Sequence, residues 1–410
     1  MDSKLRRAWL AFSRTRVGRP AHSRLVRGVQ LAKQVESLDR PRWLYRPSGV
    51  PAGTFHFRPA APVTDADVEL CRRLIAAYDA AVFVSQDRRG MWTDPIFSDR
   101  QRALSAALRD KDPARLASTM ATMFRSDFVL GLAPGSLGTA RQGPVARRIG
   151  WVQTLSKLTA VGEALGAVRL ENPEQGTVAL PLKEGGDALV ERIEALLGHS
   201  LDFPDVGAAY GPYIAGRLIA ADAPDQVYGA VRLRDAIDLH WNGHDRPPAV
   251  VEIGGGYGAM AYSFLQLRRT PYTIVDLPIV NVMQGYFLGK ALGAQAVSLY
   301  GEATGDINVL PDHALAGVPA PFDVLVNKDS MPEIPLPAAR RYLEWARESC
   351  TGMFFSYNQE AAAEFGGEAQ IVVAEVLGDI GGFERVRRDP SWVRRGYVEE
   401  VFLPTSRAES

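Results

Sequence analysis

The sequence predicts an α/β protein in which a mostly helical N-terminal region precedes a largely parallel β-sheet. From residue 250 onward, short apolar runs rich in β-branched residues alternate with segments of helical periodicity, which is the pattern of βαβ units. Before residue 240, apolar residues recur at helical spacing with little strand-like alternation. Because ligands bind beyond the carboxyl ends of the strands in such an open sheet, we expect the functional residues at that edge.

The N-terminal region is expected to contain a basic arm followed by a helical unit. We expect residues 1–60 to be partly flexible, because the first 33 residues hold nine Lys and Arg and one acid, Asp2. Residues 61–240 are expected to form a cap, substrate-binding or dimerisation region, with a loop at 131–150, which is rich in Gly, Pro and Ser. Helices are expected at 64–84, 99–108, 113–128, 152–170, 188–197 and, in two pieces broken near Pro224, 216–239.

The C-terminal region, residues 248–410, follows a linker at 242–248. Its parallel strands are expected at 249–251, 272–276, 296–299, 324–326 and 353–357, and residues 383–403 can supply a terminal antiparallel pair. Helices are expected between them at 259–267, 281–292, 338–350 and 370–380.

A glycine-rich turn joins the first of these strands to its helix. The turn contains Gly254, Gly255, Gly256 and Gly258. Glycines permit positive φ and close approach of a ligand, and the unpaired N–H groups at a helix N-terminus favour an anionic group. Asp276 ends the second strand, next to Leu277, where its carboxylate can accept hydrogen bonds from both hydroxyls of a ribose. These features predict a nucleotide-type cofactor site.

Two cofactors fit this turn. Gly254-x-Gly256-x-x-Ala259 matches the G-x-G-x-x-G/A fingerprint of NAD-binding proteins, which leaves a nicotinamide-dependent oxidoreductase as one hypothesis. Read from Glu252, the same stretch is E-x-G-x-G-x-G, the pattern of class I S-adenosylmethionine methyltransferases. An unpaired carboxylate at the end of a buried strand is costly, and the methionine ammonium would give Glu252 a cationic partner. We therefore favour S-adenosylmethionine.

Composition excludes several other classes of protein. The 410 residues carry a formal net charge of zero, which argues against a nucleic-acid partner. Cys71 and Cys350 offer no disulfide framework or metal pattern, so a reducing, cytoplasmic setting is expected. No apolar run approaches the length of a membrane span.

Several motifs resemble those of the bacterial sugar O-methyltransferase family. They are VVEIGGGYG, YTIVDLPIVNVMQGYFLG, VNKDSMPEIP and FFSYNQE, with MWTDPIF and LENPEQG upstream. The resemblance spans residues 92–360, and the DSMPE and SYNQE segments are its most specific parts. It implies a Rossmann-like, seven-stranded class I methyltransferase sheet, and methyl transfer from S-adenosylmethionine to a hydroxyl of a deoxysugar, glycoside or glycan.

The resemblance also implies roles for particular residues. Glu252, Gly254 and Gly256 would hold the amino-acid moiety of the cofactor, and Asp276 its ribose. Asp306 and Ile307 resemble the adenine-contacting turn after the third strand. The whole implied cofactor set is Glu252, Gly254, Gly255, Gly256, Gly258, Asp276, Leu277, Asp306, Ile307 and Asn327.

A second resemblance competes with the first. The triple glycine and the VDLP motif are also similar to plant-type phenolic O-methyltransferases, whose helical N-terminal region mediates dimerisation. Those enzymes carry a His-Asp pair after the fourth strand, where this chain reads Asn327-Lys328-Asp329-Ser330 without a histidine. A phenolic or other small-molecule acceptor is the alternative hypothesis, and a homodimer is compatible with it.

Methyl transfer needs an acceptor oxygen held in line with the methyl group and a group that removes its proton. Asp329 is the first candidate base, with Glu333 close behind it, and His240 and His244 are the next candidates. Asp329 and Glu333 could instead hold Mg²⁺, which prefers oxygen ligands. Substrate contacts are expected from Asn358 and Glu360, after the fifth strand. A non-catalytic binding module is disfavoured because these polar residues are present.

Overall fold

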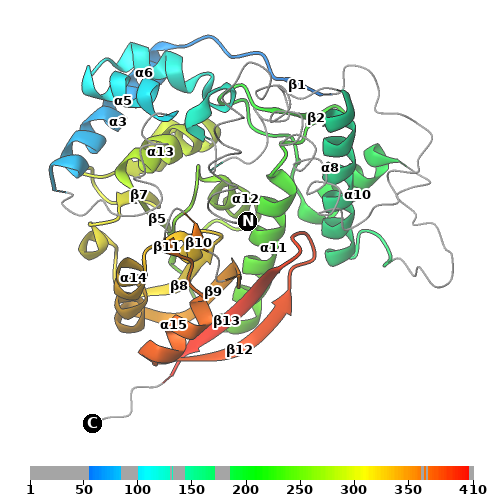
Figure 1. The fold of residues 1–410 in the computed structure, drawn as a ribbon, viewed down its shortest axis with the longest axis vertical. Coiled ribbons are helices and arrows are strands. Elements are labelled where there is room, and N and C mark those ends of the chain that lie inside the picture. Colours follow the sequence, from blue (N-terminus) through cyan, green and yellow to red (C-terminus); the bar gives the residue numbers. More distant parts are fainter. Residues whose placement is uncertain are drawn as a thin grey trace, which may run out of the picture.

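The computed structural model describes residues 55–84, 100–129, 132, 144–170, 185–361, 364–365 and 368–405, and Figure 1 shows the chain. Nearly all of the basic arm, most of the expected loop at 131–150, the MWTDPIF motif and all but the first residue of LENPEQG lie outside these residues. The described N-terminal helices are α3 (Asp65–Val84), α5 (Arg102–Arg109), α6 (Pro113–Met120), α8 (Pro144–Ala164), α10 (Gly186–Leu197) and α11 (Ala223–His240).

An eight-stranded sheet forms the centre of the C-terminal region. Its order is β12-β13-β9-β8-β4-β5-β7-β6, and β13 runs antiparallel to both of its neighbours while β6, β7, β5, β4, β8 and β9 run parallel. The predicted Rossmann-like sheet and its terminal antiparallel pair are confirmed, with one strand more than expected. The strands are β4 (Val250–Ile253), β5 (Tyr272–Asp276), β6 (Val297–Leu299), β7 (Ile307–Pro311), β8 (Phe322–Lys328), β9 (Cys350–Gln359), β12 (Phe383–Pro390) and β13 (Tyr397–Pro404).

The additional strand corrects the predicted third strand. Residues 297–299 form the edge strand β6, whereas the strand that pairs with β5 is β7. Its first residue, Ile307, was expected to lie in a turn, and the sequence analysis assigned no element to the rest of it. Asn308, whose type is depleted in strands, interrupts the apolar run of β7. Its amide donates to the Gly305 carbonyl and its Oδ1 accepts from the Gly305 N–H, so a local turn and a strand start at the same place.

Two N-terminal predictions also need correction. The stretch 216–239 holds one helix rather than two, because Pro224 lies in the first turn of α11, where a missing N–H costs nothing. Helix α8 begins at Pro144, inside the expected loop. The region also contains a small antiparallel sheet that was not predicted, formed by β1 (Phe55–Phe57), β2 (Tyr210–Ile214) and β3 (Arg217–Leu218).

Helices cover both faces of the large sheet. One face packs against α11, α12 (Ala259–Leu267) and α13 (Pro278–Leu292), and the other against α14 (Leu336–Ser349) and α15 (Val373–Ile380). Strand alternation divides the side chains, so Val250 and Val326 belong to the first core and Val251 and Leu325 to the second. None of the helices within the described ranges is long and apolar enough to cross a membrane.

The N-terminal helix α3 is bound to the C-terminal region by packing and by charge. Figure 1 shows it beside α13. Asp67 of α3 pairs with Lys290 of α13, and Arg73 donates to the carbonyl oxygens of Ala294 and Val297 at 2.7 Å each. At the centre of the contact, Gly285 of α13 leaves room for the apolar side chains of α3 and β6.

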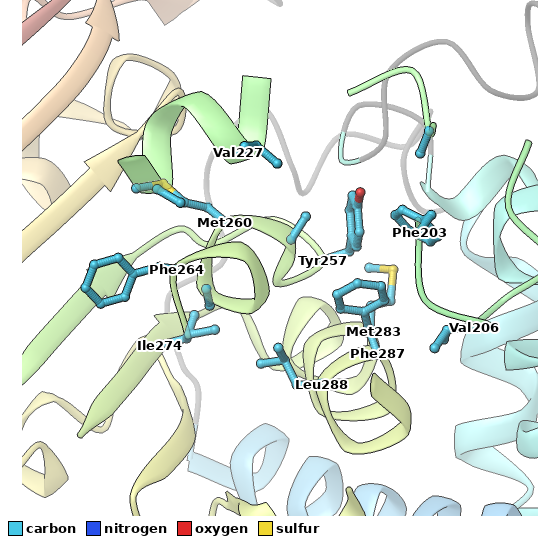
Figure 2. Close-up of a cluster of buried hydrophobic side chains, with 14 of the residues drawn as sticks. Phe203, Val206, Val227, Tyr257, Met260, Phe264, Ile274, Met283, Phe287 and Leu288 are labelled. Atoms are coloured by element: carbon cyan, nitrogen blue, oxygen red, sulfur yellow. The ribbon is translucent and has the colours of Figure 1, made fainter. Parts of the chain in front are cut away.

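Tyr257, inside the glycine-rich turn, joins the two regions at the edge where the site is expected. Figure 2 shows its ring in one cluster with Phe203 of the N-terminal region and Phe287 of α13. The ring centroids of Tyr257 and Phe287 are 5.0 Å apart, and Phe124 packs edge-on to Tyr257 at 5.1 Å. The Tyr257 hydroxyl donates to Asp222, just before α11, at 2.7 Å. The turn is therefore part of one continuous core with the N-terminal helices.

The α3–α13 contact predicts opposite effects for two glycine-to-alanine changes. A Cβ on Gly285 would lie 2.6 Å from Leu74 Cδ2 and 2.8 Å from Leu299 Cδ2, so Gly285→Ala should destabilise the protein by about 1–3 kcal/mol through overpacking. Gly378 of α15 has no atom within 4 Å of its Cβ position, so Gly378→Ala should be neutral or stabilise by up to about 1 kcal/mol. Urea unfolding of both variants checks this, and equal effects would contradict the packing.

Candidate functional site

The glycine-rich turn lies at the carboxyl end of β4 and has a conformation that requires glycine. Gly254, Gly256 and Gly258 have φ values of 72°, 58° and 94°. A Cβ on Gly254 would lie 2.1 Å from Ser330 Oγ, so this position excludes any larger residue. Gly254, Gly255 and Gly256 remain partly exposed, although both strands that flank β4 are buried. The turn thus presents bare backbone to solvent at the predicted edge.

Asn327 and Ser330 hold the end of β4 in place. Asn327 Nδ2 donates to the Ile253 carbonyl at 2.8 Å and to Ser330 Oγ at 2.7 Å, and Ser330 Oγ donates to the same carbonyl at 3.1 Å. The Asn327 side chain is completely buried on the face covered by α14 and accepts from the Met331 N–H. The Asn327 side chain therefore contacts the backbone beneath the turn and is not available to bind a ligand.

Glu252 lies beneath the turn and has a partner within the chain. Its carboxylate accepts a hydrogen bond from the Tyr272 hydroxyl at 3.0 Å, and the side chain is 1 % exposed. Burial raises the pKa of Glu252 from 4.5 to about 7. The sequence argument assumed that Glu252 has no partner within the chain and therefore needs a cationic ligand. This assumption is wrong, because the Tyr272 hydroxyl and a bound proton both lower the free-energy cost of burying Glu252.

Asp276 has hydrogen-bonding capacity left over. Its Oδ1 accepts from the Leu277 N–H at 2.8 Å, and its Oδ2 accepts from Gln284 Nε2 at 2.8 Å. Gln284 also donates to the Gly256 carbonyl at 2.9 Å, which connects the acid to the turn. Burial raises the pKa of Asp276 to about 7. Each oxygen of a carboxylate has two acceptor positions, so one on each oxygen stays open.

The structure does not place Asp306 and Ile307 at the edge where the adenine-contacting turn was expected. Ile307 opens β7 and pairs with Tyr272, whereas Asp276 pairs with Pro311 at the far end. With a rise of about 3.3 Å per residue, the two ends of β7 are roughly 13 Å apart. Asp306 and Ile307 therefore lie at the edge of the sheet opposite to the glycine turn.

Asp312 and His313 occupy the place that the sequence analysis assigned to Asp306 and Ile307. The Asp312 N–H donates to the Asp276 carbonyl at 2.8 Å, directly beyond β7. Among the described residues, Asp312 Oδ1 and both ring nitrogens of His313 are buried without a hydrogen-bond partner. Sequence could have located them only with the correct register of β7, because the PDH segment has no distinctive composition.

Asp329, the first candidate base, is already paired. Its Oδ2 accepts from Arg394 and its Oδ1 from the Tyr397 hydroxyl at 2.5 Å. Arg394 also stacks on the Tyr397 ring, 3.8 Å from its centroid. An acceptor hydroxyl would have to compete with these two donors for the carboxylate, so the pairing argues against Asp329 as the proton acceptor.

The same contacts disfavour a metal at Asp329 and Glu333. A divalent cation there would face the Arg394 guanidinium, and both Asp329 oxygens already accept hydrogen bonds. Glu333 lies in the short 3-10 helix Met331–Glu333. Throughout the described part of the chain, no three His, Cys, Asp or Glu side chains gather as a metal site would require.

His240 and His244 do not reach the glycine turn. His240 is the last residue of α11, and His244 stacks on Trp241, with the ring centroids 3.6 Å apart. Trp241 packs over Gly352, near the start of β9, so both histidines lie at the amino-terminal edge of the sheet. This follows from α11 running antiparallel to the strands, an orientation that the sequence does not reveal.

Asn358 and Glu360 diverge at the end of β9. Asn358 is buried on the α14 side, where its Nδ2 donates to Ser356 Oγ at 2.9 Å, and no described residue pairs with its Oδ1. Glu360 is exposed and pairs with Arg388 at 2.6 Å. The two predicted substrate residues are close only because they are near each other along the chain, and their side chains lie in different surroundings.

Lys328 is a site residue that the sequence analysis passed over. It is the last residue of β8, beside Asn327, and strand alternation directs it to the opposite face, toward α11. A lysine at the carboxyl end of a strand with an apolar centre, residues 324–326, was a usable signal.

Comparison with known proteins gives similarity of structure alone. No protein-family model matches the sequence, and no curated protein matches it. Magnesium protoporphyrin IX methyltransferase from Synechocystis PCC 6803, solved with bound S-adenosylmethionine, is 16 % identical over 45 % of this chain and 82 % of its own, with a TM-score of 0.32. Mitomycin 7-O-methyltransferase is 13 % identical over 82 % of this chain and 94 % of its own, with a TM-score of 0.35. At TM-scores this low we draw no functional conclusion from them.

The buried acid under the turn predicts a pH-dependent stability. Between its unfolded and folded pKa values, Glu252 holds its proton only in the folded state, so unfolding releases a proton and stability falls as pH rises from about 4.5 to about 7. Glu252→Gln removes this term and keeps an acceptor for Tyr272. As the pH rises from 5 to 8, the free energy of unfolding of the variant should therefore increase by about 2 kcal/mol relative to that of the wild type. Urea unfolding at both pH values measures the difference, and a constant difference would contradict it.

Proposed function

We propose that the chain is an S-adenosylmethionine-dependent O-methyltransferase that methylates a sugar hydroxyl. The observation that carries the cofactor part is the pairing of the exposed glycine turn with Asp276. The turn offers bare backbone at the end of β4, and Asp276 offers one open acceptor position on each carboxylate oxygen at the end of β5. A ribose has two adjacent hydroxyls, so both open positions would be used.

Two observations favour S-adenosylmethionine over NAD as the nucleotide. Strand β13 runs antiparallel between β9 and β12, unlike the largely parallel sheets of dinucleotide-binding proteins. Glu252 Oε2 lies 3.0 Å from the Cβ position of Gly255, so its charge faces the turn from below. A cationic ligand on the turn would favour the ionised form of Glu252, and the resulting carboxylate would attract that ligand. NAD has no cation at this place.

The adenine would bind beside Asp312. This residue follows β7 at the same edge as Asp276. Its Oδ1 accepts no hydrogen bond from a described residue and lies 3.5 Å from His313 Nδ1. A carboxylate oxygen can accept a hydrogen bond from the 6-amino group of an adenine. Asp312 thus takes the role that the family resemblance implied for Asp306 and Ile307.

The sugar acceptor is supported by the resemblance of the DSMPE and SYNQE segments and by polar side chains at the ends of β8 and β9. Lys328, Asp329, Gln359 and Glu360 are at least partly exposed there. A hydroxyl-rich acceptor needs several such partners. Tyr257 and Asp222 connect this edge to the N-terminal helices, so we propose that those helices form the other side of the acceptor site.

The cofactor placement is tested by three alanine variants and S-adenosylhomocysteine. Asp276→Ala should weaken binding about 10- to 100-fold, because hydrogen bonds to a charged group contribute about 1.5–3 kcal/mol. Asp312→Ala should weaken it about 10-fold, and the exposed Asp306→Ala is the matched control with unchanged affinity. Isothermal titration calorimetry measures all three. Weaker binding by the Asp306 variant alone would reverse the assignment.

The acceptor class is tested with methyl-labelled S-adenosylmethionine. Two panels are offered: methyl glycosides of hexoses and deoxyhexoses, and phenols such as catechol and caffeate. We expect label in an alkali-stable ether of a glycoside. Label in the phenols alone would keep the methyltransferase and overturn the sugar, in favour of the phenolic alternative.

A further inference from the structure

Within the part of the chain that the structure describes, the amine of Lys328 has no charged group paired with it. No described residue forms a hydrogen bond or an ion pair with its Nζ, which lies 5.5 Å from the centroid of the Tyr357 ring. Its stem passes Gly229 of α11, with Cδ and Cε 3.2 Å and 3.3 Å from the Cβ position of that glycine. Gly229 therefore gives the lysine stem room, and the side chain is only partly exposed.

The acids around Lys328 are each paired with another group. Asp225 pairs with Lys157 of α8 through its Oδ2, and its Oδ1 has no hydrogen-bond partner among the described residues. The other acids near Lys328 are also paired with other groups. Lys328 therefore has charged groups around it, but none of these acids forms an ion pair with it. The pairs are Asp222 with Tyr257, Asp225 with Lys157, and Asp329 with Arg394 and Tyr397.

The register of the sheet places Lys328 next to the glycine turn. Ile253 of β4 pairs with Asn327 of β8, so Lys328 flanks Gly254 on the neighbouring strand, about 4.8 Å away in backbone spacing. Its side chain projects to the face that also carries Glu252. An acceptor oxygen in line with a methyl group above the turn would therefore lie within reach of this amine.

We propose that Lys328 is the catalytic base that accepts the proton of the acceptor hydroxyl; this rests on the proposed function. As the acceptor oxygen forms its bond to the methyl carbon, the carbon–sulfur bond of the sulfonium breaks and its electron pair returns to sulfur. The hydroxyl proton passes to Lys328 Nζ. The products are the methyl ether, S-adenosylhomocysteine and an ammonium ion that then releases its proton to solvent.

The surroundings of Lys328 favour the neutral amine that this role requires. Burial lowers the pKa of Lys328, and Arg394 lowers it further, while Asp329, Asp225 and Asp222 oppose this in part. Burial is the largest of these causes, and the net direction is a lowered pKa. The groups that face Lys328 come from every neighbouring element: Glu252 from β4, Asp222 and Asp225 from the start of α11, Asp329 after β8, Tyr357 from β9 and Arg394 before β13.

The decisive variants are Lys328→Met and Lys328→Arg, with Lys111→Met as the matched control on an exposed lysine that pairs with Asp79. Loss of the base should lower kcat about 100-fold or more in both Lys328 variants, because a guanidinium cannot deprotonate. Affinity for S-adenosylhomocysteine should not change, and the control should equal the wild type. Retention of kcat by Lys328→Arg would overturn the proposal and indicate a cation that holds an anionic acceptor.

A chemical rescue separates a base from a structural role. Both native cysteines are buried, so the thiol introduced by Lys328→Cys can be alkylated selectively with 2-bromoethylamine to give a lysine analogue with a more acidic amine. The rescued enzyme should regain turnover, and the rising limb of its kcat against pH should shift to lower pH. An unshifted limb would overturn the proposal.

Competition labelling with 1-fluoro-2,4-dinitrobenzene gives a reading that needs no acceptor. Mass spectrometry of the wild type across pH should show that Lys328 titrates at lower pH than Lys111. Equal titration of the two lysines would refute the proposal even if no tested acceptor is methylated. Failure of the wild type to bind S-adenosylhomocysteine would instead refute the proposed function, so the two failures are distinguishable.

Discussion

The backbone at the end of β4 is held from two sides, and the rest of the site depends on this. From β8, Asn327 and Ser330 both donate to the Ile253 carbonyl. From the other side, Gln284 bridges the Gly256 carbonyl and Asp276. The Ile253 and Gly256 carbonyls are engaged, and a serine hydroxyl occupies the space of a Cβ at residue 254, so this position accepts only glycine. A ligand would therefore meet a preformed surface, which lowers the ordering cost of binding.

The N-terminal region takes part in the same construction. Tyr257 belongs to the turn, yet its ring packs with Phe203 (Figure 2). It also packs with Phe124, and its hydroxyl donates to Asp222. A change in the helical region would thus reach the cofactor turn through one side chain. The same helix, α11, brings Gly229 to the stem of Lys328. We infer that the N-terminal region, which the sequence identified only as a helical unit, forms one wall of the proposed cofactor and acceptor sites.

The sequence was sufficient for features that depend on local chemistry. The βαβ alternation, the glycine turn and the acid at the end of β5 follow from residue types and their spacing. Features that depend on register or direction were missed or misplaced. Asp306 was assigned to the wrong edge because β7 begins at Ile307, inside the segment expected to be a turn. His240 and His244 were misplaced because the direction of α11 is a tertiary property. Asp329 is next to Lys328, the base that we propose. Its carboxylate, however, is paired with Arg394, which is 65 residues away along the chain. Lys328 stands out only once its neighbours are known to be paired elsewhere.

The central claim is that this edge of the sheet binds S-adenosylmethionine, and thermal unfolding with two nucleotides tests it most directly. The protein is unfolded alone, with S-adenosylhomocysteine and with NADH. A ligand at about 100 times its dissociation constant adds about 2.7 kcal/mol of stability and raises the midpoint. We expect stabilisation by S-adenosylhomocysteine and none by NADH. Stabilisation by NADH alone would contradict the assignment of the glycine turn and of every residue placed around it.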